Sequence, residues 1–295
     1  MGVFLLAYII ENARIYKNND VVNRSMLVDK DKILQVKPSF AKYRYMKMNL
    51  DRFWMAATYV FCSHEIPESA SSADGKGFFI RRFLAEGCTT VLAVASIRSL
   101  HEWKEKVDEV RRFYQKGPLD FVIGIKIPLR ALTVPLVRKC KTEKIPAIFV
   151  EITDPRELYR IPWGWIREAL FPYNPPLIPC LSGGGERERL LAVWQTVLER
   201  ERIPFVKGPV EPYHPVKLEI LKKIGIYPLK GYLHTGGELS YNLFIDDGTR
   251  YLPPDKAETP AVTVHKGEIV RVLDKIMYRP NKGEELVVYR PAFFS

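Results

Sequence analysis

Cys62 and His64 carry the most informative chemistry in this chain, because both side chains can bind a metal. They stand two positions apart in the apolar segment 56–65. Alternate residues of a β-strand point to the same face of a sheet, so the thiol and the imidazole would lie side by side. Zinc accepts both groups as ligands. The segment is therefore predicted to be a strand that ends in two candidate ligands.

The bulk composition predicts an ordinary globular protein with a substantial core. The chain has 295 residues, of which 47% are hydrophobic, and this length suits one large or two modest domains. Its one long apolar run, residues 2–10, ends at Glu11, well short of the length that spans a bilayer. The run has neither a basic leader nor a small-residue cleavage site. We expect a buried strand there, and a cytoplasmic protein without a membrane partner.

The cysteines and the net charge argue against two other classes of protein. No Cys-x-x-Cys pair occurs among the four cysteines, so neither a zinc knuckle nor a disulfide framework is indicated. The formal net charge of +11 could indicate an acidic partner. The basic residues are dispersed, however, in short clusters such as residues 42–47 and 81–82, with acidic residues between them. A solvated basic surface is the favoured interpretation, and a nucleic-acid partner is not expected.

The spacing of the apolar runs divides the chain into three parts. Near both ends, short alternating runs are separated by turn residues such as Asp29, Lys30 and Asp31, which is typical of antiparallel hairpins. In the middle, apolar runs of strand length alternate with helical patterns, which favours βα units around a parallel sheet. The runs in the middle part are residues 58–62, 89–95, 121–127, 147–152, 177–181 and 204–207.

Two helices of the middle part are predicted by the periodicity of their apolar residues. In residues 100–114, the apolar face consists of Trp103, Val107, Val110 and Tyr114. In residues 186–202, it consists of Leu190, Trp194, Val197 and Leu198. We therefore predict an α/β protein in which a barrel-like domain, residues 57–221, is inserted into a small β-sandwich. The sandwich would be composed of both termini, residues 1–56 and 222–295.

Several segments, taken in their order along the chain, resemble the amidohydrolase superfamily, particularly its dihydroorotase, hydantoinase and allantoinase branch. Residues 56–65 align with the family strand that reads Pro-Gly-Phe-Ile-Asp-x-His-x-His, and residues 83–91 look like the helix and strand that follow it. Residues 8–16 and 25–36 look like the first sandwich strands. Residues 220–237 are similar to the exit from the barrel, where a short helix and a Lys-Gly turn lead back to the sandwich.

The resemblance implies a TIM-type (β/α) barrel. A full eight-stranded barrel takes roughly 200 residues or more, whereas residues 58–207 supply only about 150 residues and six predicted strands. A shortened or incomplete barrel is therefore expected.

The chemistry that the resemblance implies is hydrolysis of a non-peptide carbon-nitrogen bond by metal-activated water. The family holds one or two divalent ions with histidines, often together with a carboxylated lysine. Cys62 replaces the first histidine of the family strand and His64 retains the second. Lys126, at the end of residues 120–126, resembles the bridging lysine. The alternative for Lys126 is a surface lysine at a strand end.

The remaining groups of the family site match less well. Val150 stands where the family has a histidine, and Glu151 beside it could supply an oxygen ligand, although strand alternation points it to the opposite face. No aspartate matches the family's proton acceptor. Residues 209–215 offer Glu211 and His214 in its place, and the alternative for this segment is a proline-stiffened loop.

Because His64 is the one clearly retained family ligand, the favoured function is a binding or scaffold protein with an eroded metal site. The alternative is a metal-dependent hydrolase of the cyclic-amide type, with Cys62, His64, Lys126 and Glu151 around zinc or another divalent cation. The favoured function requires no cofactor. An unclosed barrel would expose sheet edges, which suggests a homo-oligomer or a protein partner. The substrate is not specified by the sequence.

Overall fold

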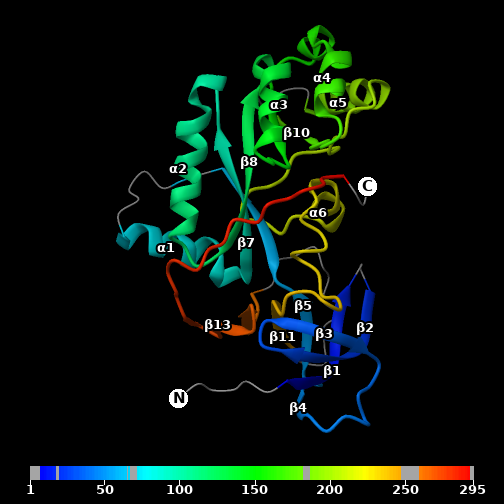
Figure 1. Ribbon diagram of the computed structural model, residues 1–295, viewed down its shortest axis with the longest axis vertical. Coiled ribbons are helices and arrows are strands. Elements are labelled where there is room, and N and C mark those ends of the chain that lie inside the picture. The colour runs from blue at the N-terminus through cyan, green and yellow to red at the C-terminus, as the bar shows by residue number, and fades with distance from the viewer. Residues whose placement is uncertain are drawn as a thin grey trace. The chain divides into compact units, whose positions relative to one another are not determined.

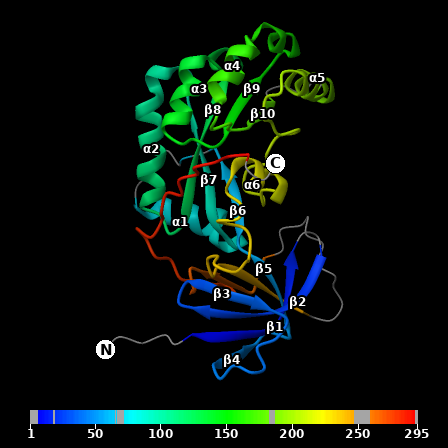
Figure 2. The same ribbon diagram turned by 45° about the vertical axis from the view of Figure 1, so that its right-hand side comes forward.

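The chain divides into two compact units, which are described one at a time (Figures 1 and 2). This computed structural model describes residues 7–17, 20–64, 66, 72–181, 187–246 and 259–292. The first unit consists of Met1–Val60, Ser71–Thr90 and Tyr227–Arg279. The second unit consists of Phe61–Ala70, Val91–Ile226 and Pro280–Ser295.

In the first unit, the described strands form one mixed sheet that draws on both ends of the chain (Figure 1). Its strands are β1 (Tyr8–Lys17), β2 (Asp20–Asp29), β3 (Lys32–Lys37), β4 (Met46–Asn49), β5 (Phe53–Ala57), β11 (Tyr241–Ile245), β12 (Val262–His265), β13 (Glu268–Val272) and β14 (Lys275–Ile276). The order is β14-β13-β12-β11-β5-β1-β2-β3, and β4 pairs with β1. Antiparallel pairing of β5 with β11 joins the two ends of the chain.

The core of this unit is built from alternating apolar residues of the same strands. The cluster contains Ile10, Ala13, Ile15, Met26, Val28, Ile33, Leu50, Met55, Leu233, Leu239, Tyr241, Leu243 and Val264. The pattern in β1 is offset by a bulge at Asn12, whose φ of 56° lets Ile10 and Ala13 both point inward. The predicted turn between β2 and β3 is confirmed at Lys30 and Asp31. Ile9 and Ile10, the end of the apolar run predicted as a strand, are buried in β1, and residues 2–6 lie outside the described residues.

The first unit also contains α1 (Ser72–Arg82) and the short η1 (Leu84–Glu86). Gly87 ends η1 with a φ of 74°, and a Cβ atom there would lie 2.6 Å from Asn242 Nδ2. The same Asn242 amide donates a hydrogen bond to the Gly87 carbonyl at 3.0 Å. Glycine is therefore required both by the backbone and by the close approach of β11.

The second unit contains a five-stranded sheet that curls into a half-barrel (Figure 2). Its strands are β6 (Tyr59–Ser63), β7 (Cys88–Ser96), β8 (Asp120–Pro128), β9 (Ile148–Ile152) and β10 (Leu177–Leu181). The order is β10-β9-β8-β7-β6, and β8, β9 and β10 pair in parallel. Both β6 and β7 begin in the first unit. The mixed α/β class that the sequence predicted is confirmed.

Helices connect these strands, as the alternating pattern predicted. They are η2 (Leu100–Glu102), α2 (Trp103–Gln115), η3 (Leu129–Ala131), α3 (Val134–Thr142), η4 (Pro155–Arg160), α4 (Trp163–Leu170), α5 (Arg187–Arg200) and α6 (Leu218–Ile224). The apolar faces predicted for α2 and α5 are confirmed, because all eight of the residues named for them are buried. None of the described helices is both long and apolar enough to cross a membrane.

The predicted strand at residues 204–207 is wrong. Only an isolated bridge joins Phe205 to Leu177 of β10, through hydrogen bonds of 2.9 Å from Leu177 to Pro204 and from Val206 to Leu177. Pro204 has no N–H group, so the segment cannot extend a regular ladder.

The segment that follows pairs with the opposite edge of the same sheet. Pro212 and Pro215 form isolated bridges with Cys62 and Phe61 of β6, and the Tyr213 N–H donates to the Cys62 carbonyl at 3.0 Å. Both outer strands thus have bonded neighbours within the chain. The self-association expected from exposed sheet edges stays a prediction.

Candidate site at the carboxyl end of the five-stranded sheet

Cys62 and His64 lie side by side at the end of β6. The strand buries Val60, Phe61 and Cys62, which fixes its position in the unit. Cys62 Sγ lies 3.5 Å from His64 Nε2. Burial raises the pKa of the Cys62 thiol well above its usual range, and the neighbouring Cys180 raises it further. The thiol is therefore protonated at neutral pH.

Lys126 and Glu151 form a second pair, on β8 and β9. Lys126 Nζ lies 2.8 Å from Glu151 Oε1, and about a third of each side chain is exposed. The β8–β9 register aligns Lys126 with Phe149, and Glu151 follows two residues later on the same face of β9. Fully buried Val150 lies on the other face. Alternation therefore carries Glu151, and not Val150, toward Lys126.

Phe149 brings the two pairs onto one face of the sheet. Its ring contacts the His64 ring edge to face, with centroids 4.9 Å apart and planes at 85°. Gly124 of β8 lies beside this ring, since a Cβ atom at Gly124 would be in ordinary contact, at 3.4 Å, with Phe149 Cε2 and with Leu92 Cδ1. An apolar ring thus separates the imidazole from the Lys126–Glu151 pair while holding them on one surface.

Cys180 is a further member of this group that the sequence interpretation did not include. The β9–β10 register aligns it with Glu151. Burial raises the pKa of Cys180 to about 11, against a lowering effect of Lys126 and with a further raising effect of Glu151. The available signal was its place near the end of an apolar run, as for Lys126. Together, Cys62, His64, Lys126, Glu151 and Cys180 form what we call the strand-end group.

Glu211 and His214, the residues considered as proton acceptors, lie in the segment that borders β6. Both side chains are exposed. The His214 ring is hydrogen-bonded through Nδ1 to the carbonyl of Pro212 at 2.9 Å, within its own loop. The Tyr213 side chain of this loop contacts β6, since its hydroxyl accepts a hydrogen bond of 3.5 Å from Ser63. The contacts of these described residues thus support the loop interpretation.

The strand-end group fits a single soft cation better than a lysine-bridged pair of ions. Zinc bonds of about 2.3 Å to sulfur and about 2.0–2.1 Å to nitrogen, at a tetrahedral angle, separate the two ligand atoms by about 3.5 Å. The Cys62–His64 distance agrees with that value. Lys126, by contrast, has its amino group against the Glu151 carboxylate. A carboxylated lysine in that place would face another anion.

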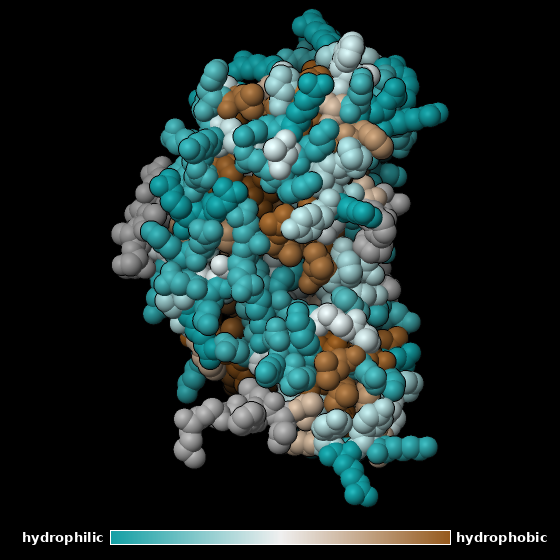
Figure 3. All heavy atoms as spheres, in the orientation of Figure 1, coloured by the Kyte–Doolittle hydropathy of each residue, from teal (hydrophilic) through white to brown (hydrophobic). Residues whose placement is uncertain are grey.

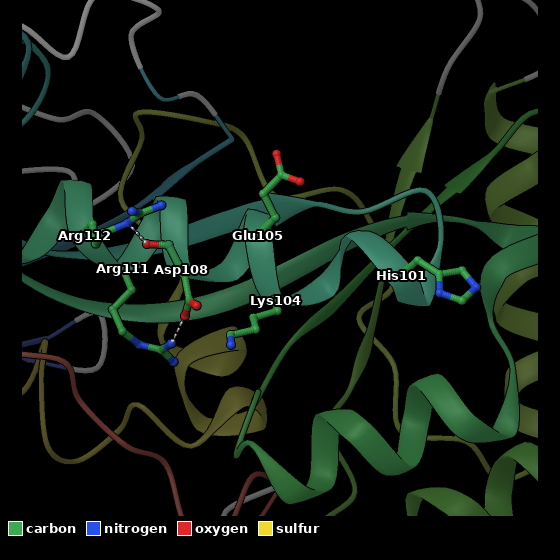
Figure 4. A pocket seen from close by; sticks show the side chains of 6 residues that line it. All are labelled: His101, Lys104, Glu105, Asp108, Arg111 and Arg112. Carbon is green, nitrogen blue, oxygen red and sulfur yellow. Dashed lines mark hydrogen bonds and ion pairs between the residues drawn. The ribbon is translucent and has the colours of Figure 1, made fainter.

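A shallow hollow on α2 offers another place for a ligand (Figure 4). Its lining is His101, Lys104, Glu105, Asp108, Arg111 and Arg112. Acidic and basic side chains alternate there, and Arg111 is ion-paired to Asp108 at 2.9 Å. Figure 3 shows a largely hydrophilic surface over this helix. The arrangement is typical of a solvated helix face, so the strand-end group is the better candidate.

Comparison with known proteins supports the predicted resemblance at the level of the fold. No protein-family model and no curated protein matches the sequence. A solved D-hydantoinase covers 97% of this chain and 100% of its own, with a TM-score of 0.66 and 11% identity. A dihydropyrimidinase from Brevibacillus agri covers 98% of this chain and 99% of its own, with a TM-score of 0.60 and 11% identity. A beta-aspartyl dipeptidase from Fervidobacterium islandicum covers 94% of this chain and 99% of its own, with a TM-score of 0.55 and 11% identity. These neighbours are amidohydrolase superfamily members.

Proposed function

We propose that this chain is a binding or scaffold protein on a shortened amidohydrolase-type barrel, and that it does not hydrolyse cyclic amides. The observation that carries the proposal is the ion pair between Lys126 and Glu151, with its 2.8 Å separation. The pair occupies the strand ends where a hydrolase of this fold would hold its cation.

The charges of the strand-end group balance without a cation. The Lys126 ammonium neutralises the Glu151 carboxylate, and the raised pKa values of Cys62 and Cys180 keep both thiols neutral. Zinc binds cysteine as the thiolate, so two protonated thiols offer it no anionic sulfur. This group has one carboxylate, which already has a partner.

The proposed lack of hydrolysis rests also on the proton acceptor. General base catalysis requires a group within hydrogen-bond reach of the attacking water. Glu211 is exposed and, in the part of the chain that the structure describes, makes no side-chain hydrogen bond. His214 is bound to its own loop. Neither residue is oriented by the strand-end group.

The second candidate function is a metal-dependent hydrolase, and the Cys62–His64 distance specifically favours it. Those two residues would hold zinc, and Cys180 and Glu151 are the next available ligands on the same face. A bound cation would polarise a carbonyl and lower the pKa of water. Lys126 would then have to release Glu151.

Metal analysis together with a ring-opening assay separates the two functions. The full chain is incubated with excess zinc, passed into metal-free buffer, and analysed for zinc and for hydrolysis of hydantoin and dihydrouracil. We expect much less than one zinc per chain and no ring opening above that in buffer. One retained zinc with measurable hydrolysis would establish the hydrolase instead.

Two variants identify the origin of any retained metal. Cys62→Ala and His64→Ala should abolish zinc binding if the strand-end group is responsible. Cys88→Ala is the matched control, because Cys88 is a buried thiol of the other unit. Equal loss of zinc in the control would assign the metal to a different place and leave the strand-end group as a site without a cation.

A further inference from the structure

Residues 37–47, which we call the basic loop, form an exposed surface in the first unit. The segment begins at the end of β3 and runs into β4 (Figure 1). Phe40 is buried against Ile9 and Leu27 and anchors it. The Tyr43 N–H donates to the Phe40 carbonyl at 2.9 Å, which closes a turn. Beyond Phe40, every side chain of the loop is exposed.

Two tyrosines of the basic loop present their rings to solvent. Tyr43 is 37% exposed and Tyr45 is 44% exposed. Their rings are nearly parallel, at 23°, with centroids 6.4 Å apart. Lys37 donates to the Tyr43 hydroxyl at 3.4 Å, and the edge of Phe40 packs on the Tyr43 ring at 5.1 Å. These contacts hold the first ring in place, and the first ring positions the second.

The charge around these rings has one sign. Residues 32–50 contain five basic residues and no acidic residue. Lys47 pairs with Glu11 at 2.7 Å. In the described part of the chain, Lys37, Lys42 and Arg44 take part in no ion pair. The face of α2 in Figure 4 differs, because its Arg111 is bound by both Asp108 and Glu285.

We propose that the basic loop binds single-stranded nucleic acid, a function beyond that of the strand-end group. Lys42 and Arg44 would contact phosphates, and Tyr43 and Tyr45 would stack on unpaired bases. Proteins that bind single strands combine these two elements, a basic path for the backbone and aromatic side chains for the bases. The dispersed charge of the whole sequence predicted no such partner, but the structure leaves the basic cluster at residues 42–47 exposed, and within the described residues Lys42 and Arg44 take part in no ion pair.

The chemistry of the loop favours a single strand over two other polyanions. A duplex keeps its base faces stacked inside, so the tyrosine rings would find no partner there. Stable binding to a membrane surface needs a large apolar face besides the basic residues. Among the exposed residues of the basic loop, only Pro38, Ala41 and Met46 have aliphatic or thioether side chains.

Fluorescence anisotropy with a labelled 15-nucleotide single strand tests the proposal on the full chain. Tyr45→Ala and the pair Tyr43→Ala/Tyr45→Ala retain every charge, and we expect the pair to weaken binding by about tenfold or more. Lys42→Gln/Arg44→Gln retains both rings. It should weaken binding and lower the slope of log affinity against log salt by about 1.4, since each phosphate contact of a single strand contributes roughly 0.7.

The matched control removes the same charge from another exposed surface. Lys104→Gln/Arg112→Gln lies on α2 and should change neither the affinity nor the slope. Equal weakening by this control, or undiminished binding by the tyrosine variants, would reduce the effect to general polyanion attraction and overturn the proposal. Equal affinity for a duplex of the same length would also overturn it. So would tyrosine-dependent binding to phosphatidylserine vesicles without binding to the oligonucleotide.

Discussion

The strand-end group and the basic loop both contain lysine, but the charges of the two places are balanced differently. At the strand ends, Lys126 is bound to Glu151 and lies beside neutral thiols, so its charge is satisfied internally. In the basic loop, Lys42 and Arg44 are exposed and have no acidic partner among the residues that the structure describes. The first arrangement holds strands together, whereas the second leaves charge available to a partner.

The largest effect is expected from removing the ring of Phe149, which contacts His64 and lies between it and the Lys126–Glu151 pair. Phe149→Ala should lower the free energy of unfolding by about 3–5 kcal/mol, because Phe149 is fully buried and its removal leaves a cavity beside His64. Urea unfolding measures the change. Trp165→Ala on α4 is the control, since this larger aromatic side chain is 67% exposed and should change stability by at most about 0.5 kcal/mol. Similar losses in both variants would show that Phe149 has no special packing role.

The next test asks whether Lys126 is structural. Lys126→Met leaves the Glu151 carboxylate half-buried without its cation, and we expect a loss of about 1–3 kcal/mol. The double variant Lys126→Met/Glu151→Leu removes both charges and should recover most of that loss. Urea unfolding of the two single variants and the double variant gives the coupling energy. A loss in the double variant equal to the sum of the single losses would mean that the ion pair is not coupled.

The strand-end thiols should react slowly at neutral pH. Because the pKa of Cys180 is raised to about 11, its thiolate fraction at pH 8 is far below that of an ordinary cysteine. Its alkylation by iodoacetamide, measured in a chain whose other cysteines are replaced by alanine, should accelerate as pH rises toward 11. Stability should fall over the same range, because the unfolded thiol loses its proton first. Fast alkylation at pH 7 would contradict the protonated site.

The smallest effect is expected in the basic loop. Tyr45→Ala and Lys42→Gln/Arg44→Gln should each change the free energy of unfolding by less than about 0.5 kcal/mol, because these side chains are exposed. Thermal unfolding followed by circular dichroism checks this directly. A larger loss would indicate that the loop supports the sheet of its unit, and the contrast with the strand-end group would disappear.

Local periodicity accounts for the elements that could be predicted. The buried faces of α2 and α5 follow from apolar residues three and four positions apart, and five of the six predicted middle strands occur. The exception at Pro204 was an apolar run without the N–H donors that a ladder needs. The candidate site was harder to predict from the sequence. Alternation alone could not tell whether Val150 or Glu151 faces Lys126, because that depends on the register between strands.

The sequence by itself determined that this is an α/β chain with hairpins at both ends, and that Cys62 and His64 share one face of a strand. It did so because strand and helix periods are properties of neighbouring residues. Only the tertiary structure decided that Glu151 neutralises Lys126 and that Cys180 joins them. It also decided that Lys42 and Arg44 have no acidic partner within the described part of the chain. Those outcomes depend on the pairing of segments far apart in the chain, which the order of residue types does not specify.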